Sequence, residues 1–196
     1  MQTTKKWSTK TLVLGAVLTA LVFLLQMMGS FIHFGPFSVS LVLIPIVIGA
    51  ATCGFEVSAY LGLVFSVAVF ASGDAAAFMA VDVFGTIVTV VLKGVLCGLC
   101  AGLVYKGVMK LFGKNMVAVL AAAIVCPIVN TGVFLLGCLV FFMDTVVAWG
   151  QAAGFGDVGQ YLILGLVGAN FLFEIASNIV LSPLVVRLLN IRKKQQ

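Results

Sequence analysis

Clusters of positive charge divide this chain into long apolar stretches, and their spacing constrains the fold more than any other feature. One cluster lies between residues 5 and 10, a second between 106 and 114, and a third between 187 and 194. Lys93 is the only basic residue outside them. With 63% hydrophobic residues, 9% charged residues and a mean hydropathy of +1.27, a soluble domain of 196 residues could not bury so much apolar surface. The sequence therefore predicts an integral membrane protein.

The apolar segments between the clusters are suited to helices that cross a bilayer, which takes about 20 residues each. Breaks containing Gly, Pro, Asp or Lys separate them. We expect one all-α membrane domain over residues 1–196, a bundle of six transmembrane helices. The expected helices cover residues 10–28, 38–53, 55–71, 83–105, 116–143 and 158–189.

Six spans would place both termini on the same side of the membrane. The loops at 29–37, 72–82 and 145–157 contain no Lys or Arg, whereas both termini and the 106–114 turn are basic. The positive-inside rule then makes the termini cytoplasmic. Because the positive charge flanks apolar segments in this way, we expect a lipid environment and no nucleic-acid partner.

The chain lacks the usual signatures of catalysis. It contains no phosphate-binding loop of the G-x-x-x-x-G-K-[ST] type, no H-E-x-x-H and no G-x-S-x-G. Cys97 and Cys100 form a C-x-x-C without a second pair or a His nearby, and His33 is the only histidine. We therefore expect no enzyme activity, no cofactor and no metal site.

Polar residues within the last apolar segment point to a site. Asn170, Glu174 and Asn178 are spaced four apart, which places them on one face of a helix. Burying such groups in a membrane costs a few kcal/mol each on insertion scales, so this face should turn inward. It would form either the wall of a solute pocket or a polar seam that holds helices together.

Lys93 lies about ten residues from the outer end of its expected helix, which is about 15 Å deep at 1.5 Å per residue. At that depth it is separated from the cytoplasmic charges. It could bind an anionic or carbonyl group of a ligand. Alternatively, it could form a structural ion pair with Glu174 or extend its ammonium toward the interface.

Asn130 and Thr131 follow Pro127 in the fifth segment. Proline removes a backbone donor and leaves a carbonyl nearby without its partner, so Asn130 could simply satisfy the loosened backbone. The alternative is that Asn130, which lies in the outer half of its helix, meets Lys93 and Asn170 across one cavity.

The outer loops add aromatic and acidic candidates. His33 and Phe34 lie between the first and second helices, and Asp74 and Phe78 lie between the third and fourth. Aromatic rings beside a polar cavity could close over a flat ligand. Alternatively, the phenylalanines could belong to the aromatic belt at the membrane interface, and His33 could be solvated.

Small residues at four-residue spacing mark faces where helices approach closely. Gly94, Gly98 and Gly102 form a double G-x-x-x-G beside Lys93, so that the packed face of this helix should border the pocket. Ala16 and Ala20 form an A-x-x-x-A on the first helix, which would pack either internally or against a partner protein.

Several stretches resemble the substrate-binding S components of energy-coupling factor (ECF) vitamin transporters. The L-x-L-I-P-I-V-I-G-A run at Leu41–Ala50 and the following C-G-F-E are similar to the second helix and turn of that family, although many members have G-P at the turn. The A-x-x-x-A at Ala16 and Ala20 is similar to its motif for contact with a transmembrane partner. The N-F-L-F-E-I-A-S-N run at Asn170–Asn178 looks like the last helix of pantothenate, riboflavin and folate type members.

The resemblance implies a six-helix bundle in a prokaryotic plasma membrane. The solute would be a small water-soluble vitamin, bound near the outer face by the last three helices and the outer loops. Uptake would need a transmembrane coupling (T) subunit, contacted through Ala16 and Ala20, and two ATPase subunits. A carboxylate at Lys93 would suit pantothenate, whereas the aromatic loops would equally suit a flavin or pteridine. The alternative is a small structural or assembly protein whose polar stripes only pack helices.

Overall fold

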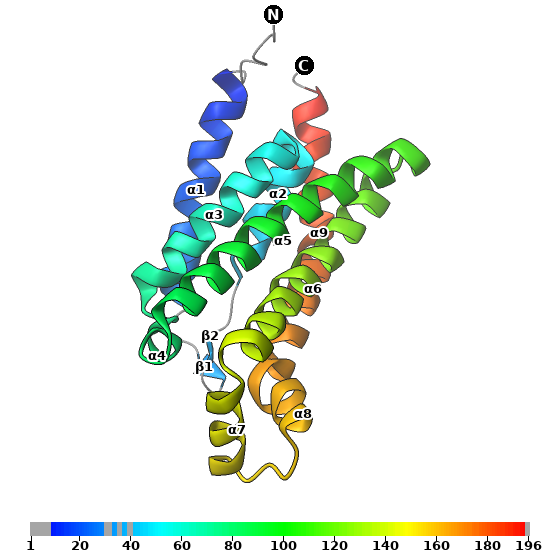
Figure 1. Ribbon diagram of the computed structural model, residues 1–196. Helices are drawn as coiled ribbons and strands as arrows, with labels where there is room; N and C mark the ends of the chain where they lie inside the picture. Colours follow the sequence, from blue (N-terminus) through cyan, green and yellow to red (C-terminus); the bar gives the residue numbers. More distant parts are fainter. Residues whose placement is uncertain (1–8, 30–32, 35–36, 39–40, 195–196) are drawn as a thin grey trace, which may run out of the picture.

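The computed structural model describes residues 9–29, 33–34, 37–38 and 41–194, with only the backbone described at 33–34, 37–38 and 192–194. It is a bundle of long helices with one short β-hairpin (Figure 1). In chain order the elements are α1 (Thr9–Gly29), β1 (His33–Phe34), β2 (Phe37–Ser38), α2 (Leu43–Cys53), α3 (Phe55–Ser72), α4 (Ala76–Met79), α5 (Val83–Phe112), α6 (Asn115–Phe141), α7 (Met143–Ala152), α8 (Val158–Gln160), η1 (Tyr161–Gly168) and α9 (Ala169–Lys194).

Within the described ranges, five helical stretches are long and apolar enough to cross a membrane: α1, α3, α5, α6 and the continuous segment Val158–Ile191. Large apolar side chains such as Leu111 and Val180 are more than 70% exposed on the outside, where lipid can cover them. The expected helical membrane fold is therefore confirmed. With 11 residues, α2 extends about 16 Å, shorter than a hydrocarbon core of about 30 Å, so the count of six spans remains a prediction.

The helices run up and down, so that the turns gather at two ends of the bundle (Figure 1). The start of α1, the α5–α6 turn and the end of α9 lie together, at what we call the basic end. The hairpin, α4 and α7 lie at the opposite end, called the hairpin end. That the basic end faces the cytoplasm remains a prediction from the charge distribution.

Two predicted helix boundaries, the start of the second helix and the end of the fourth, are among those that differ most from the structure. The second helix begins at Leu43 and not at residue 38, because 37–38 pair with 33–34 in an antiparallel hairpin. The fourth helix continues to Phe112 and not to residue 105. It ends where Gly113 adopts φ 65°, a conformation that glycine takes readily, and donates its N–H to the Met109 carbonyl.

Two expected loops also contain helix. The short α4 lies within 72–82, and α7 occupies much of 145–157, so that the fifth long helix ends at Phe141 rather than at 143. The last helical stretch begins at 158 as predicted but continues to 194, and its segment Tyr161–Gly168 is π-helical. Pro127 lies inside α6 without ending it.

The glycine stripe of α5 packs directly on α3. A Cβ at Gly94 would lie 2.4 Å from the Gly62 carbonyl oxygen, and one at Gly98 would lie 2.1 Å from that of Ser58, so only glycine permits this contact. Hydrogen bonds join the same surfaces, because Ser58 Oγ donates to the Gly98 carbonyl at 2.6 Å. The close approach fixes α5, and with it Lys93, against α3.

The buried apolar residues form two clusters. The larger draws on α1, α2, α3, α5, α6 and α9, and the smaller surrounds Phe78 near the hairpin end. The cavity described next has members of both clusters in its wall.

Candidate solute-binding site

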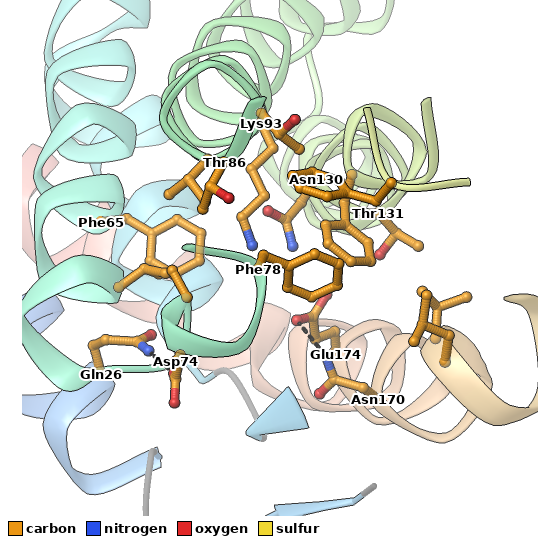
Figure 2. A pocket seen from close by; sticks show the side chains of 18 residues that line it. Gln26, Phe65, Asp74, Phe78, Thr86, Lys93, Asn130, Thr131, Asn170 and Glu174 are labelled. Carbon is orange, nitrogen blue, oxygen red and sulfur yellow. Dashed lines mark hydrogen bonds between the residues drawn. The ribbon is translucent and has the colours of Figure 1, made fainter. Parts of the chain in front are cut away.

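A cavity of about 70 Å³ lies between the helices (Figure 2). Its polar lining consists of Gln26, Asp74, Thr86, Thr89, Lys93, Asn130, Thr131, Asn170 and Glu174. Its apolar lining consists of Phe65, Val69, Ala75, Phe78, Val90, Phe134, Phe142, Leu166 and Val167. This volume holds a few water molecules, whereas pockets for drug-sized ligands measure about 300–1,000 Å³. A larger solute would therefore require the walls to part.

Buried polar atoms without a partner gather at this cavity. Among the described side chains there are five: Gln26 Oε1, Thr89 Oγ1, Asn130 Oδ1, Asn170 Oδ1 and Glu174 Oε2. All five residues line it. Buried polar groups are nearly always hydrogen-bonded, and an orphaned one costs about 1–3 kcal/mol. The buried atoms that could still form hydrogen bonds are thus concentrated at this cavity.

A second cavity, of about 520 Å³, lies between the α2–α3 turn and the last turns of α5. Its polar groups come from Thr52, Glu56, Tyr105, Lys106 and Asn115. None of the five unpartnered atoms belongs to its lining. By size alone the second cavity would be the better candidate for a binding site, but the unpartnered polar atoms favour the first.

Lys93 reaches from α5 into the first cavity (Figure 2). Its Nζ lies 5.5 Å from the ring centroids of both Phe65 and Phe134, within the range of a cation–π interaction. The ion pair with Glu174 that the sequence left open is not formed. Glu174 Oε1 accepts from Asn170 Nδ2 at 3.3 Å, and its Oε2 has no partner.

The stripe on the last helix reaches the cavity only in part. Asn170 and Glu174 line it, and Glu174 is 1% exposed. Asn178 is also buried, at 4% exposed, but lies outside the cavity wall, one turn nearer the basic end. Besides the bond to Asn170 of its own helix, the Glu174 side chain interacts with the Asn130 amide of α6, while its Oε2 keeps no partner.

The structure also brings α6 and α4 to the wall. Asn130 and Thr131 line the cavity, and Asn130 Oδ1 has no partner. Asp74 and Phe78 line it as well. Phe78 lies in α4 and is 5% exposed, with its ring packed edge-on against Phe134, Phe142 and Trp149 at centroid distances of 5.0–5.6 Å. The predictions for His33 and Phe34 concern side chains outside the described part of the structure.

Ala16 and Ala20 lie away from this site. Both are exposed on α1, whereas Gly15, Leu18 and Val22 of the same helix are buried. The A-x-x-x-A therefore does not pack internally within the described bundle.

Gln26 is the main residue that the sequence reasoning missed. It is 2% exposed, lines the cavity, and its Nε2 donates to the Asp74 carboxylate and to Ser72 Oγ at 3.3 Å. It is the only Asn or Gln within residues 10–28, so the rule that selected Asn130 would also have found it. Thr86 gives no such signal, because its hydroxyl donates at 2.6 Å to the carbonyl of Asp82, the N-cap residue of its own helix.

A family model matches most of the chain. The model of the family described as "ECF transporter, substrate-specific component" matches residues 10–187 of the 196. No curated protein matches the chain. The family comprises substrate-binding subunits of transporters rather than enzymes. Because the match covers nearly the whole sequence, the chain belongs to the family of substrate-specific components of ECF transporters.

Proposed function

We propose that this chain binds a small water-soluble vitamin in the cavity beside Lys93 and presents it to an ECF complex for uptake into the cell. The observation that carries the proposal is the convergence of five unpartnered buried polar atoms and one ammonium on a single cavity. Within a membrane, such groups are retained at a cost and mark substrate pathways.

The cavity lies toward the hairpin end, since Gln26, Asp74 and Phe78 belong to the segments that meet there (Figure 1). If the basic end is cytoplasmic, this end faces outward, where a nutrient would arrive. A pantothenate-like solute is slightly favoured, because a carboxylate would complement Lys93. The aromatic rings of Phe65 and Phe134 leave a flavin or pteridine as the alternative.

The second candidate is a structural role in which the polar groups only hold helices together. It is less well supported, because Glu174 Oε2, Asn130 Oδ1 and Gln26 Oε1 bond to nothing across the cavity. A seam that served packing would use these atoms.

Binding can be tested without knowing the solute. We expect mass spectrometry of the purified chain to find a co-purifying vitamin, and that vitamin to stabilise the protein by about 2.7 kcal/mol at a hundredfold excess over its Kd. The stabilisation would be measured as a shift of the thermal unfolding midpoint in detergent. If none of the water-soluble vitamins shifted the midpoint, the structural role would be the better explanation.

The exposed stripe of α1 is proposed to contact the T subunit, which would work with two ATPase subunits. Ala16→Leu is expected to abolish co-purification with the T subunit, because a larger side chain would hold the helices apart. Solute binding should be unchanged, since Ala16 is remote from the cavity lining. Ala176→Leu, at an exposed alanine of α9, is the matched control. An intact complex with Ala16→Leu would contradict the assignment.

A further inference from the structure

We propose that the cavity selects a carboxylate-bearing solute whose other polar groups are hydrogen-bond donors. This inference rests on the proposed function and specifies the chemistry of the solute. The wall atoms that lack partners, and the kind of bond that each can make, determine this chemistry.

The unpartnered atoms of the wall are mainly acceptors. Three are amide oxygens and one is a carboxylate oxygen, all of which can only accept, and the fifth is the Thr89 hydroxyl. Amide orientations are assigned from hydrogen-bond networks, and here carboxylates fix two of them. The nitrogens of Gln26 and Asn170 donate to Asp74 and Glu174, so reversing either amide would place oxygen against oxygen. A solute that fills the cavity must therefore donate hydrogen bonds.

Lys93 supplies the opposite requirement. Among the described residues it is the only cationic one in the cavity lining. It carries three donors, and its ammonium lies over two rings rather than on Glu174. Phenylalanine faces attract a cation but accept no conventional hydrogen bond. A carboxylate is the group that satisfies both the charge and the donors.

Each other class of solute leaves one part of the wall unsatisfied. A carboxylate without donor groups would leave the amide oxygens orphaned, which disfavours binding. A neutral polyol would leave Lys93 without a counter-charge. A cation could pair with Asp74 or Glu174 of the lining but would leave the Lys93 ammonium without a counter-charge. The arrangement in Figure 2, with Lys93 on one wall and Glu174 and Asn170 on another, thus favours a solute with an anionic end and a donor-rich end.

The test measures the affinity of the purified full chain for solutes that separate these classes. Pantothenate and biotin combine a carboxylate with O–H or N–H donors, nicotinate has the carboxylate alone, pantothenol and riboflavin have donors without a carboxylate, and thiamine is cationic. We expect a member of the first class to bind at least tenfold more tightly than every member of the others. Pantothenate and pantothenol form the sharpest pair, because a carboxylate and a CH₂OH group are their only difference.

Substitutions test whether Lys93 causes the preference for a carboxylate. In Lys93→Met, the carboxylate that binds the native chain most tightly should lose at least tenfold in affinity and bind no better than its neutral counterpart. Lys106→Met is the control, because Lys106 Nζ also lies 5.5 Å from a ring, that of Phe55, but in the other cavity. It should retain the full preference.

The outcomes separate this inference from the proposed function. Tightest binding of riboflavin, pantothenol, nicotinate or thiamine would overturn the inference and leave the vitamin-binding function standing. So would a carboxylate preference that persisted in Lys93→Met. Failure of every member of the panel to bind would overturn both.

Discussion

Gly98→Ala is expected to destabilise the protein by about 3 kcal/mol, the upper end of the usual cost of overpacking. The added Cβ would lie 2.1 Å from the Ser58 carbonyl oxygen on α3, and backbone atoms cannot rotate away as a side chain can. Relieving the clash would separate α5 from α3 and break the bond from Ser58 Oγ to the Gly98 carbonyl. The free energy of unfolding in detergent would measure the effect.

Gly107→Ala is the matched control on the same helix. Gly107 is exposed, and nothing lies within 4 Å of a Cβ built there, so the change should stabilise α5 by up to about 1 kcal/mol through helix propensity. The two substitutions are chemically identical, but they are expected to change the free energy of unfolding in opposite directions. Equal effects, or a stable Gly98→Ala protein, would contradict the α3–α5 contact.

The helices were predictable because a bilayer demands long apolar segments, which are visible in sequence. Their ends were less so, and α5 shows why. Lys106 and Lys110 indicate where the hydrocarbon ends, but a helix can continue into water because lysine favours helix and is stabilised near a C-terminus. Gly113 was the better signal for the boundary. The helix α2 began late because residues 37–38 pair with 33–34 in a hairpin, which took part of its expected length.

The polar part of the site was predictable for the same physical reason. Against an apolar background each buried polar residue is costly, so Lys93, Asn130 and Glu174 were conspicuous in the sequence. Of the aromatic part only Phe78, in an outer loop, was predicted; Phe65 and Phe134 differ little from their apolar neighbours in the sequence, and only packing selects them. The role of these residues in binding a solute remains a prediction.

Asn178 shows a further limit of helical spacing. At 3.6 residues per turn, each step of four residues rotates the position by about 40°. Asn178 is therefore turned about 80° from Asn170 as well as two turns along the axis. A stripe at four-residue spacing predicts a shared face over one step, as for Asn170 and Glu174. Over two steps it no longer predicts that both ends contact the same cavity, in agreement with the lining.

Glu174→Leu is expected to weaken solute binding about 10- to 100-fold, since hydrogen bonds to charged groups contribute about 1.5–3 kcal/mol. The empty protein should be at least as stable as the native one. Glu174 is buried without an ion pair among the described residues, and replacing a buried charge by an apolar side chain of similar size is often neutral or stabilising. Calorimetric titration would give the affinity, and unfolding in detergent the stability.

The change in solute affinity and the change in stability of the empty protein together distinguish a binding site from a packing seam. If Glu174 held helices together, its replacement would destabilise the empty protein, and any loss of binding would follow from that. If it serves the solute, stability and affinity should move independently. Ser177→Ala is the control, because Ser177 Oγ donates to the Glu174 backbone carbonyl and the residue lies outside the cavity lining. A Glu174→Leu protein that bound the solute normally but unfolded more easily would favour the seam. A side chain that is buried only to bind the solute should not be needed for the stability of the empty protein.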